Sequence, residues 1–264
     1  MKNKLSISIL ISNYNKEKFL VNCLKSACSQ DYRNYEVILV DDNSTDNSIE
    51  IIRKFKKVKL IRLKKFKNVN PPLRQINSLI NCFEKSKGKI ICFLDADDIF
   101  DKKKLKIISS YFKKHEKKKF VVNNVQHNKI LRLKRINYKE NKWPSIFPTS
   151  CISVKREFFK KFIDFSLKDK LPNLEIDSRM IIFSSFYNDE FNYINNRLTN
   201  YIYDKKGISS KYKILSSKWW LKRNEAYYYL KFILKKRNKT FKKSFDYYIT
   251  KFLFYLIFFY KKLI

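Results

Sequence analysis

Six aspartates lie in two clusters, each following an apolar run that is typical of a β-strand. They are Asp41, Asp42 and Asp46 after residues 35–40, and Asp95, Asp97 and Asp98 after residues 90–94. Carboxylates held close together repel one another unless a cation, or hydrogen bonds to the charged form, offset the repulsion. The chain has only 24 acidic residues against 59 basic ones, so this grouping predicts a divalent metal and a polar ligand at one edge of a sheet.

Apolar periodicity predicts the elements that would position these carboxylates. Alternating or continuous apolar runs predict strands at residues 5–11, 35–40, 58–63 and 90–94. Apolar residues at helical spacing predict helices at residues 16–29, 47–56 and 71–87. Strand and helix alternate through residue 115, which implies parallel βαβ units with right-handed crossovers. Such sheets bind ligands outside the carboxyl ends of their strands, and both clusters lie at that edge.

The composition suits a folded α/β protein with a very basic surface. The 264 residues, 44% of them hydrophobic, allow one large α/β domain or a catalytic domain with an appendage. Three explanations of the formal charge of +35 stay open: nucleic-acid binding, contact with an anionic membrane, and a compositional bias that leaves most lysines solvated.

The cysteines and the chain's apolar stretches predict a cellular location. The five cysteines form no CxxC pair, and we expect small buried residues in a reducing compartment rather than a zinc site. The N-terminus lacks the pattern of a signal peptide. The longest apolar stretch, residues 252–260, is too short to span a bilayer as a helix. We therefore expect a cytoplasmic protein.

Three motifs carry a family resemblance. They are Ser-Ile-Leu-Ile-Ser-Asn-Tyr-Asn-Lys (8–16), Val-Ile-Leu-Val-Asp-Asp-Asn-Ser-Thr-Asp (37–46) and Gly-Lys-Ile-Ile-Cys-Phe-Leu-Asp-Ala-Asp-Asp (88–98). In this order and spacing they resemble the family two glycosyltransferases. The resemblance implies a GT-A fold, which is α/β and Rossmann-like, with a mostly parallel central sheet flanked by helices. It also implies transfer of a sugar from a nucleotide diphosphate to an acceptor hydroxyl, with inversion of the anomeric centre.

The resemblance assigns the donor site to residues near the strand ends. Asn13 and Tyr14 would contact the base through the backbone and by stacking, although Tyr14 could instead be a loop-packing aromatic. Asp42 would accept a hydrogen bond from the base. Asp95 and Asp97 lie on one side of an extended segment. Asp95 would meet the ribose, or the metal through water, and Asp97 would bind Mn²⁺ or Mg²⁺ bridging the diphosphate oxygens.

Four further residues have supporting or alternative roles. Arg74 and Gln75 lie on the helix at 71–87, where related proteins carry donor-binding positions. Asp46 is expected to cap the helix at 47–56. Asp98 is either a ligand of the site or the N-terminal cap of the helix that follows it.

The acceptor side requires a base that deprotonates the incoming hydroxyl. Residues 174–180 (Leu-Glu-Ile-Asp-Ser-Arg-Met) resemble the Asp-x-Arg form found in some family members. Asp177 is the proposed base, Glu175 is the alternative base, and Arg179 would orient the base or hold phosphate. Asp177 could also be a helix N-terminal acid favoured by the macrodipole. Family members often have a His after the last core strand, and residues 198–204 contain none.

The expected organisation is a GT-A glycosyltransferase domain followed by a helical extension. The domain, residues 1–210, would have a nucleotide-sugar-binding half at 1–115 and an acceptor-side half at 116–210. The extension, residues 211–264, interleaves basic and aromatic residues, which suits an amphipathic helix on an anionic membrane surface. The alternative is a helical pair that caps the domain with its aromatics in the core, and both can hold at once.

The expected function is that of an inverting, metal-dependent glycosyltransferase of cell-surface polysaccharide synthesis. A UDP-sugar is the preferred donor, and the acceptor is a glycan or a lipid-linked molecule. The protein would be cytoplasmic or peripheral at the inner face of the cell membrane, with no nucleic acid as partner. A nucleotidyltransferase of related fold is an alternative, although residues 12–16 lack the Gly-rich loop of that class. A nucleic-acid-binding protein is a weaker one, since it leaves the acidic clusters unexplained.

Overall fold

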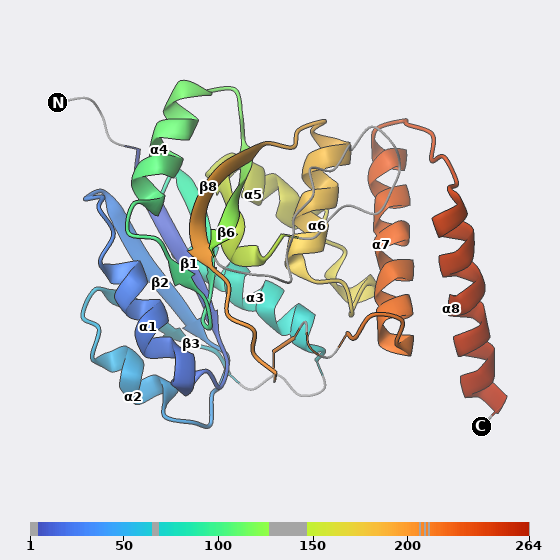
Figure 1. The fold of residues 1–264 in the computed structure, drawn as a ribbon, viewed down its shortest axis with the longest axis horizontal. Helices are drawn as coiled ribbons and strands as arrows, with labels where there is room; N and C mark the ends of the chain where they lie inside the picture. The colour runs from blue at the N-terminus through green and yellow to red at the C-terminus, as the bar shows by residue number, and fades with distance from the viewer. Residues whose placement is uncertain are drawn as a thin grey trace.

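A single mixed sheet forms the centre of the protein (Figure 1). The computed structural model describes residues 5–64, 69–126 and 147–263, apart from residues 206, 209 and 211. Within these residues, an eight-stranded sheet has the order β3-β2-β1-β4-β7-β6-β8-β5. The strands are β1 Ile7–Asn13, β2 Tyr35–Asp41, β3 Val58–Arg62, β4 Ile90–Asp95, β5 Ile99–Phe100, β6 Phe120–Gln126, β7 Ile152–Lys155 and β8 Tyr193–Asn200.

The N-terminal half of the sheet is parallel, as the sequence predicts. β1 pairs in parallel with β2 and β4, and β2 pairs in parallel with β3. Their carboxyl ends therefore meet at one edge, where both aspartate clusters begin. In the second half, β7 runs antiparallel to β4 and β6, β6 is parallel to β8, and β5 is antiparallel to β8. The expected α/β architecture with a mostly parallel sheet is confirmed.

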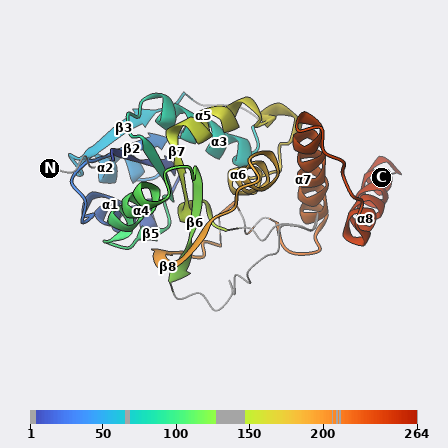
Figure 2. The ribbon, with the colours of Figure 1, turned by 90° about the horizontal axis from the view of Figure 1, so that it is seen from above.

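Helices cover both faces of the sheet because apolar side chains on the strands point alternately to either side. They are α1 Glu17–Cys28, α2 Ser48–Arg53, α3 Pro71–Glu84, α4 Lys104–Lys114, α5 Arg156–Asp164, α6 Ile176–Ile182, α7 Ser217–Lys236 and α8 Phe245–Leu263. On β1, Ile9 packs in one core with α1, α2 and α4, whereas Leu10 packs in the other with α3, α5 and α6. Figure 2 shows these two groups of helices on opposite sides of the sheet.

Short turns complete the acceptor-side half. They are 3₁₀ turns at Thr149–Cys151 and Lys168–Lys170, and a π-helical turn at Phe183–Tyr187. The π turn directly continues α6. Strand β7 was not predicted, because its four residues are too few to show a period.

A buried lysine ties the second half of the sheet together. Lys104, at the start of α4, is fully buried. Its Nζ donates to Asn123 Oδ1 at 2.9 Å, to the Ser150 carbonyl at 2.5 Å and to Thr199 Oγ1 at 3.0 Å. Burial lowers the pKa of Lys104 to about 8. These bonds hold β6, β8 and the turn that carries Ser150 in fixed positions beside β4.

The C-terminal helices lie at the far end from the N-terminal helices (Figures 1 and 2). α7 buries Ala226, Tyr229 and Ile233 in the same core cluster as α3, α5 and α6, and α8 packs on the outer side of α7. α7 therefore has the capping arrangement expected as one alternative, whereas most aromatic side chains of α8 are exposed. A domain boundary at residue 210 stays a prediction. Among the described helices, none is long and apolar enough to cross a membrane.

Candidate active site

A cavity of about 350 Å³ opens at the carboxyl ends of β1, β2 and β4. This is within the size range of small-molecule sites. The loops after the three strands contribute Tyr14, Asp42 and Asp97, α6 contributes Asp177, and the segment after β8 contributes Asp204. Residues from both halves of the sequence therefore surround one space, at the edge where parallel sheets bind ligands.

One end of the cavity combines an aromatic ring, a guanidinium and a carboxylate. Arg74 Nε donates to Asp42 Oδ2 at 2.5 Å, and its Nη2 donates to the Asp42 carbonyl at 2.9 Å. The Arg74 Cζ lies 4.1 Å from the centre of the half-exposed Tyr14 ring. Burial raises the pKa of Asp42, although the Arg74 guanidinium opposes the shift. Asp42 Oδ1 is buried without a hydrogen-bond partner among the described residues, so it can accept a hydrogen bond from a ligand.

Asn13 supports this end rather than facing it. Its fully buried side chain donates to Asp41 Oδ1 at 2.7 Å and to Ser44 Oγ at 3.2 Å, and it is not among the described residues that line the cavity. The Asn13 carbonyl accepts from the Asp42 N–H at 2.9 Å. The turn passes through Asn43 at φ 60°, a left-handed conformation that Asn tolerates. The expected contact between the Asn13 backbone and a base stays a prediction.

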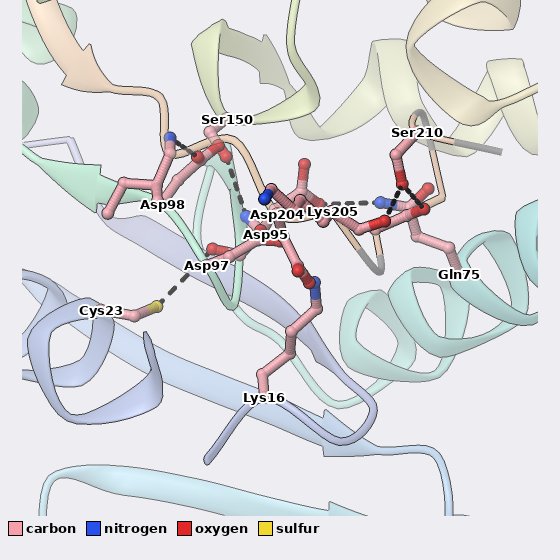
Figure 3. A network of polar contacts seen from close by, with 12 residues as sticks. Lys16, Cys23, Gln75, Asp95, Asp97, Asp98, Ser150, Asp204, Lys205 and Ser210 are labelled. Atoms are coloured by element: carbon pink, nitrogen blue, oxygen red, sulfur yellow. Dashed lines mark hydrogen bonds and ion pairs between the residues drawn. The ribbon is translucent and has the colours of Figure 1, made fainter. Parts of the chain in front are cut away.

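Asp95 lies deeper in the cavity and is held from two sides (Figure 3). Gln75 Nε2 donates to Asp95 Oδ1 at 2.7 Å, and the Asp95 N–H donates to Ser150 Oγ at 2.9 Å. Burial raises the pKa of Asp95 well above its usual range, and the nearby carboxylates of Asp98, Asp97 and Asp177 raise it further. Asp95 and Gln75 both line the cavity, as their predicted roles require.

Asp97 and Asp204 both form an ion pair with the ammonium group of Lys16. Lys16 Nζ lies 2.5 Å from Asp97 Oδ2 and 2.6 Å from Asp204 Oδ2 (Figure 3). Further along the chain, the Ser210 hydroxyl donates to the Gly207 carbonyl at 2.7 Å. Asp204 lies in the segment, residues 198–204, where family members often have a His and this chain has none. Neither Asp204 nor Lys16 was predicted from the sequence as a site residue.

The carboxylates fit a hard divalent ion in part. Mg²⁺ is commonly held by one or two carboxylates together with substrate phosphates and water. Asp97 and Asp204 supply two such oxygens converging on one cation. The described residues contain no group of three or more His, Cys, Asp or Glu side chains placed to hold a metal ion. Phosphate and water oxygens would therefore have to complete the coordination.

Asp98 has a different role from both of those expected. It is fully buried, and its Oδ1 accepts from the Ile202 N–H at 2.9 Å. It does not cap α4, which begins at Lys104, and it is not among the described residues that line the cavity. Burial, with help from Asp97, raises its pKa to about 7. Asp98 thus anchors the segment that carries Asp204.

Asp46 has the helix-terminal role that was predicted. Its two carboxylate oxygens accept from the N–H groups of Ser48 and Glu17, each at 3.0 Å. These are the first residues of α2 and α1. Burial raises the pKa of Asp46, but the hydrogen bonds outweigh this effect and lower it overall. Asp46 therefore stabilises two helix starts at once.

Asp177 and Glu175, from the start of α6, also line the cavity. Asp177 accepts from the Ser178 N–H at 2.5 Å, and burial, with the nearby Glu175 carboxylate, raises its pKa to about 7. Glu175 forms a buried ion pair with Lys222 of α7. Its Oε1 has no hydrogen-bond partner among the described residues. Lys222 was not expected near the site, because nothing in its local sequence relates it to Glu175.

Arg179 does not take the predicted position. It is fully buried, and it donates to the carbonyls of Leu174, Leu171 and Ser166. Burial lowers its pKa to about 10. Its planar set of N–H donors thus cross-links the loop before α6 instead of orienting Asp177 or facing the cavity. The predicted catalytic role of Arg179 is replaced by a structural one.

Comparison with known sequences places the chain in a family. Residues 8–189 match the family described as Glycosyl transferase family 2. The Escherichia coli UDP-Glc:alpha-D-GlcNAc-diphosphoundecaprenol beta-1,3-glucosyltransferase WfaP is 34% identical over 130 residues, which are 45% of this chain and 50% of that protein. The Staphylococcus aureus (strain Mu50) poly(ribitol-phosphate) beta-N-acetylglucosaminyltransferase TarS is 27% identical over 114 residues, 42% of this chain and 19% of that protein. The match thus spans at most half the length of these two relatives.

Solved structures agree on the fold. TarS 1–349 from S. aureus in complex with UDP has a TM-score of 0.65 at 16% identity, covering 95% of this chain and 70% of that one. The mannosyltransferase PcManGT from Pyrobaculum calidifontis, in complex with GDP-Man and Mn²⁺, has a TM-score of 0.64 at 15% identity, with coverages of 91% and 66%. The fold of the chain is therefore of GT-A type.

The family follows from the extent of the sequence match. Because residues 8–189 make up more than half of the chain, the chain belongs to glycosyl transferase family 2. This membership favours a glycosyltransferase over the nucleotidyltransferase and nucleic-acid-binding alternatives.

Proposed function

We propose that the protein transfers a sugar from a nucleotide diphosphate, preferably a UDP-sugar, to a hydroxyl of a glycan or lipid-linked acceptor, with inversion. One observation carries the proposal: a single cavity has an unpaired carboxylate oxygen on Asp42 beside the Tyr14 ring, a cation between Asp97 and Asp204, and a carboxylate of raised pKa at Asp177. These are the three groups that a nucleotide, a diphosphate and an acceptor hydroxyl require.

The nucleotide would bind where the protein offers stacking and an unpaired acceptor. Its base would stack on Tyr14, and an N–H of the base would donate to Asp42 Oδ1. Arg74 holds the Asp42 carboxylate in place, and Gln75 does the same for Asp95, which would accept from the ribose. The E. coli relative's name specifies a UDP-sugar, and the TarS structure contains UDP, which supports UDP as the first nucleotide to test.

Asp97 and Asp204 would hold the divalent metal. Mn²⁺ or Mg²⁺ suits their oxygen ligands, and the PcManGT structure contains Mn²⁺. When bound, the ion would stabilise the charge that develops on the leaving diphosphate. Asp98 fixes the backbone at Ile202 and so keeps Asp204 facing Asp97.

Asp177 would act as the general base that deprotonates the acceptor hydroxyl. A carboxylate with a pKa of about 7 can accept a proton near neutral pH. The acceptor hydroxyl would give its proton to Asp177 while its oxygen bonds to the anomeric carbon. The bond from that carbon to the diphosphate oxygen breaks, and its electron pair leaves with the diphosphate. Glu175 is less suited to this role, because its carboxylate is already paired with Lys222.

A thermal-shift panel tests the donor assignment. UDP-, GDP- and dTDP-sugars would be added to the protein with and without MnCl₂. We expect stabilisation by one nucleotide that depends on Mn²⁺ and is lost in Asp97→Ala, whereas Asp164→Ala, an exposed aspartate at the end of α5, keeps it. No shift with any donor would contradict the proposal.

The outer face of α8 supports peripheral membrane contact as part of this function. Its apolar members are spaced at helical intervals and are 51–81% exposed; they are Phe245, Tyr248, Phe252, Leu256 and Phe259. Exposed Lys242 and Lys243 precede the helix, and Asp246, its only carboxylate, is engaged by Arg223. An apolar stripe with basic neighbours suits the interface of an anionic bilayer and would bring the cavity to a lipid-linked acceptor.

Vesicle sedimentation tests the membrane contact with the full chain. We expect pelleting with phosphatidylglycerol-containing vesicles, weakened at least about tenfold when Phe252, Leu256 and Phe259 are all changed to Ser. Ile214→Ser, an exposed apolar residue before α7, is the control and should pellet like the wild type. Equal pelleting of the triple variant would contradict the contact.

A further inference from the structure

Lys16 is held between two carboxylates inside the cavity (Figure 3). The three side chains come from the turn after β1, the turn after β4 and the segment after β8, and each is at most 17% exposed. A lysine ammonium is charged at neutral pH, and the two carboxylates beside it favour this charged form.

The ammonium occupies the point on which both carboxylates converge. Its nitrogen lies 2.5 and 2.6 Å from the two oxygens. A magnesium ion bound by the same oxygens would lie at about 2.1 Å from each, a difference of only about half an ångström. An ammonium and a divalent ion cannot share this position, because they would overlap and repel each other. Occupation by Lys16 and occupation by the metal are therefore alternatives.

We propose that Lys16 is a built-in counter-cation that competes with the divalent metal for Asp97 and Asp204 and yields to it only when the donor diphosphate arrives. This inference rests on the proposed function. Two carboxylates and one ammonium leave one net negative charge at the site. A divalent ion together with a sugar-linked diphosphate adds no net charge, so the exchange keeps the balance. The flexible stem of Lys16 lets the displaced ammonium move to the diphosphate oxygens.

Binding of the divalent metal in the absence of nucleotide should be weaker. A divalent ion that enters without nucleotide has to displace the ammonium from both carboxylates, and no diphosphate is present to receive it. The metal should therefore bind weakly to the free protein and tightly together with the nucleotide. In this way the metal and the donor bind as a unit, and the repulsion between the two carboxylates stays offset by one ammonium between turnovers.

Binding of Mn²⁺ alone tests the inference, with free Mn²⁺ measured by electron paramagnetic resonance. In Lys16→Met, which has similar length and no charge, Mn²⁺ should bind the nucleotide-free protein at least about tenfold more tightly than in the wild type. Lys16→Arg keeps the charge and should bind Mn²⁺ weakly. Lys18→Met, at an exposed lysine two residues further on, should match the wild type. MnCl₂ should also raise the Tm of Lys16→Met more than that of the wild type.

The outcomes separate this inference from the proposed function. If the wild type binds Mn²⁺ in the presence of UDP, GDP or dTDP but Lys16→Met binds Mn²⁺ alone no better than the wild type, the competition is refuted and the metal-dependent function stands. If neither protein binds Mn²⁺ under any of these conditions, both are refuted. A tighter Mn²⁺ site in Lys16→Arg as well would assign the effect to side-chain shape instead of charge, and would also overturn the inference.

Discussion

The two ends of the cavity are built in different ways. At the donor end, Tyr14, Asp42 and Asp97 leave the sheet directly from the ends of β1, β2 and β4. At the acceptor end, Glu175 and Asp177 stand at the start of α6, and the charge of Glu175 is balanced by Lys222 from α7. The donor end thus depends on the parallel sheet, whereas the acceptor end depends on helix packing. A change in how α6 and α7 pack would alter the acceptor end and leave the donor end intact.

The largest expected loss of transfer activity follows from a substitution at the donor end. Asp97→Ala removes one of the two carboxylates that converge on the cation, so transfer should fall on the order of 10³-fold. Turnover of UDP-sugar in saturating MnCl₂ measures the loss, with Asp164→Ala as the matched control. Activity within a few-fold of the wild type would show that the diphosphate is stabilised without Asp97.

A comparable loss should follow at the acceptor end without any loss of donor binding. Asp177→Asn keeps the size of the side chain but cannot take up the acceptor proton, so transfer should fall about 10²- to 10⁴-fold while nucleotide affinity is unchanged. In the wild type, the rate should rise as pH increases through about 7, because the base works only when deprotonated. Retained transfer in Asp177→Asn, with a loss in Glu175→Gln, would move the base to Glu175.

An intermediate effect should show that α7 belongs to the acceptor end. Lys222→Met leaves the buried Glu175 carboxylate without its partner, which costs about 3 kcal/mol and lowers the Tm by several degrees. Nucleotide binding below the Tm should be unchanged, since Lys222 is not among the described residues that line the cavity. Lys218→Met, at an exposed position in the same helix, is the control. Unchanged stability of Lys222→Met would show that the ion pair does not form.

The smallest effect concerns the base end of the nucleotide. Tyr14→Ala removes a half-exposed ring that stacks on Arg74, and nucleotide affinity should fall about tenfold through lost stacking. Calorimetric titration with UDP measures the change, and Tyr255→Ala on α8 is the control. An unchanged affinity would mean that Tyr14 is only a loop-packing residue, as the alternative holds.

Local sequence pattern was sufficient to place three carboxylates of the donor end, although not Asp204 or Lys16 beside them. Residues that alternate along β1, β2 and β4 determine which side chains are buried, and parallel pairing places the next residues of each strand at one edge. Asp42, Asp95, Asp97 and the supporting role of Asp46 follow from this rule. It could not show that the Asn13 side chain turns inward, because its partner Asp41 lies 28 positions further along the chain.

Contacts between distant parts of the chain settled what local pattern could not. Lys16 meets Asp97 across 81 positions and Asp204 across 188, and Lys222 meets Glu175 across 47. No periodicity links residues at such separations. The pairing of β1 with β4 brings Lys16 to Asp97, whereas the packing of β8 and α7 brings Asp204 and Lys222 to their partners. Tertiary packing also buries Arg179 among backbone carbonyls and places Asp98 where it accepts from the Ile202 N–H. Residue order therefore decided which groups could do chemistry at the sheet edge, and tertiary packing decided which of them share one cavity.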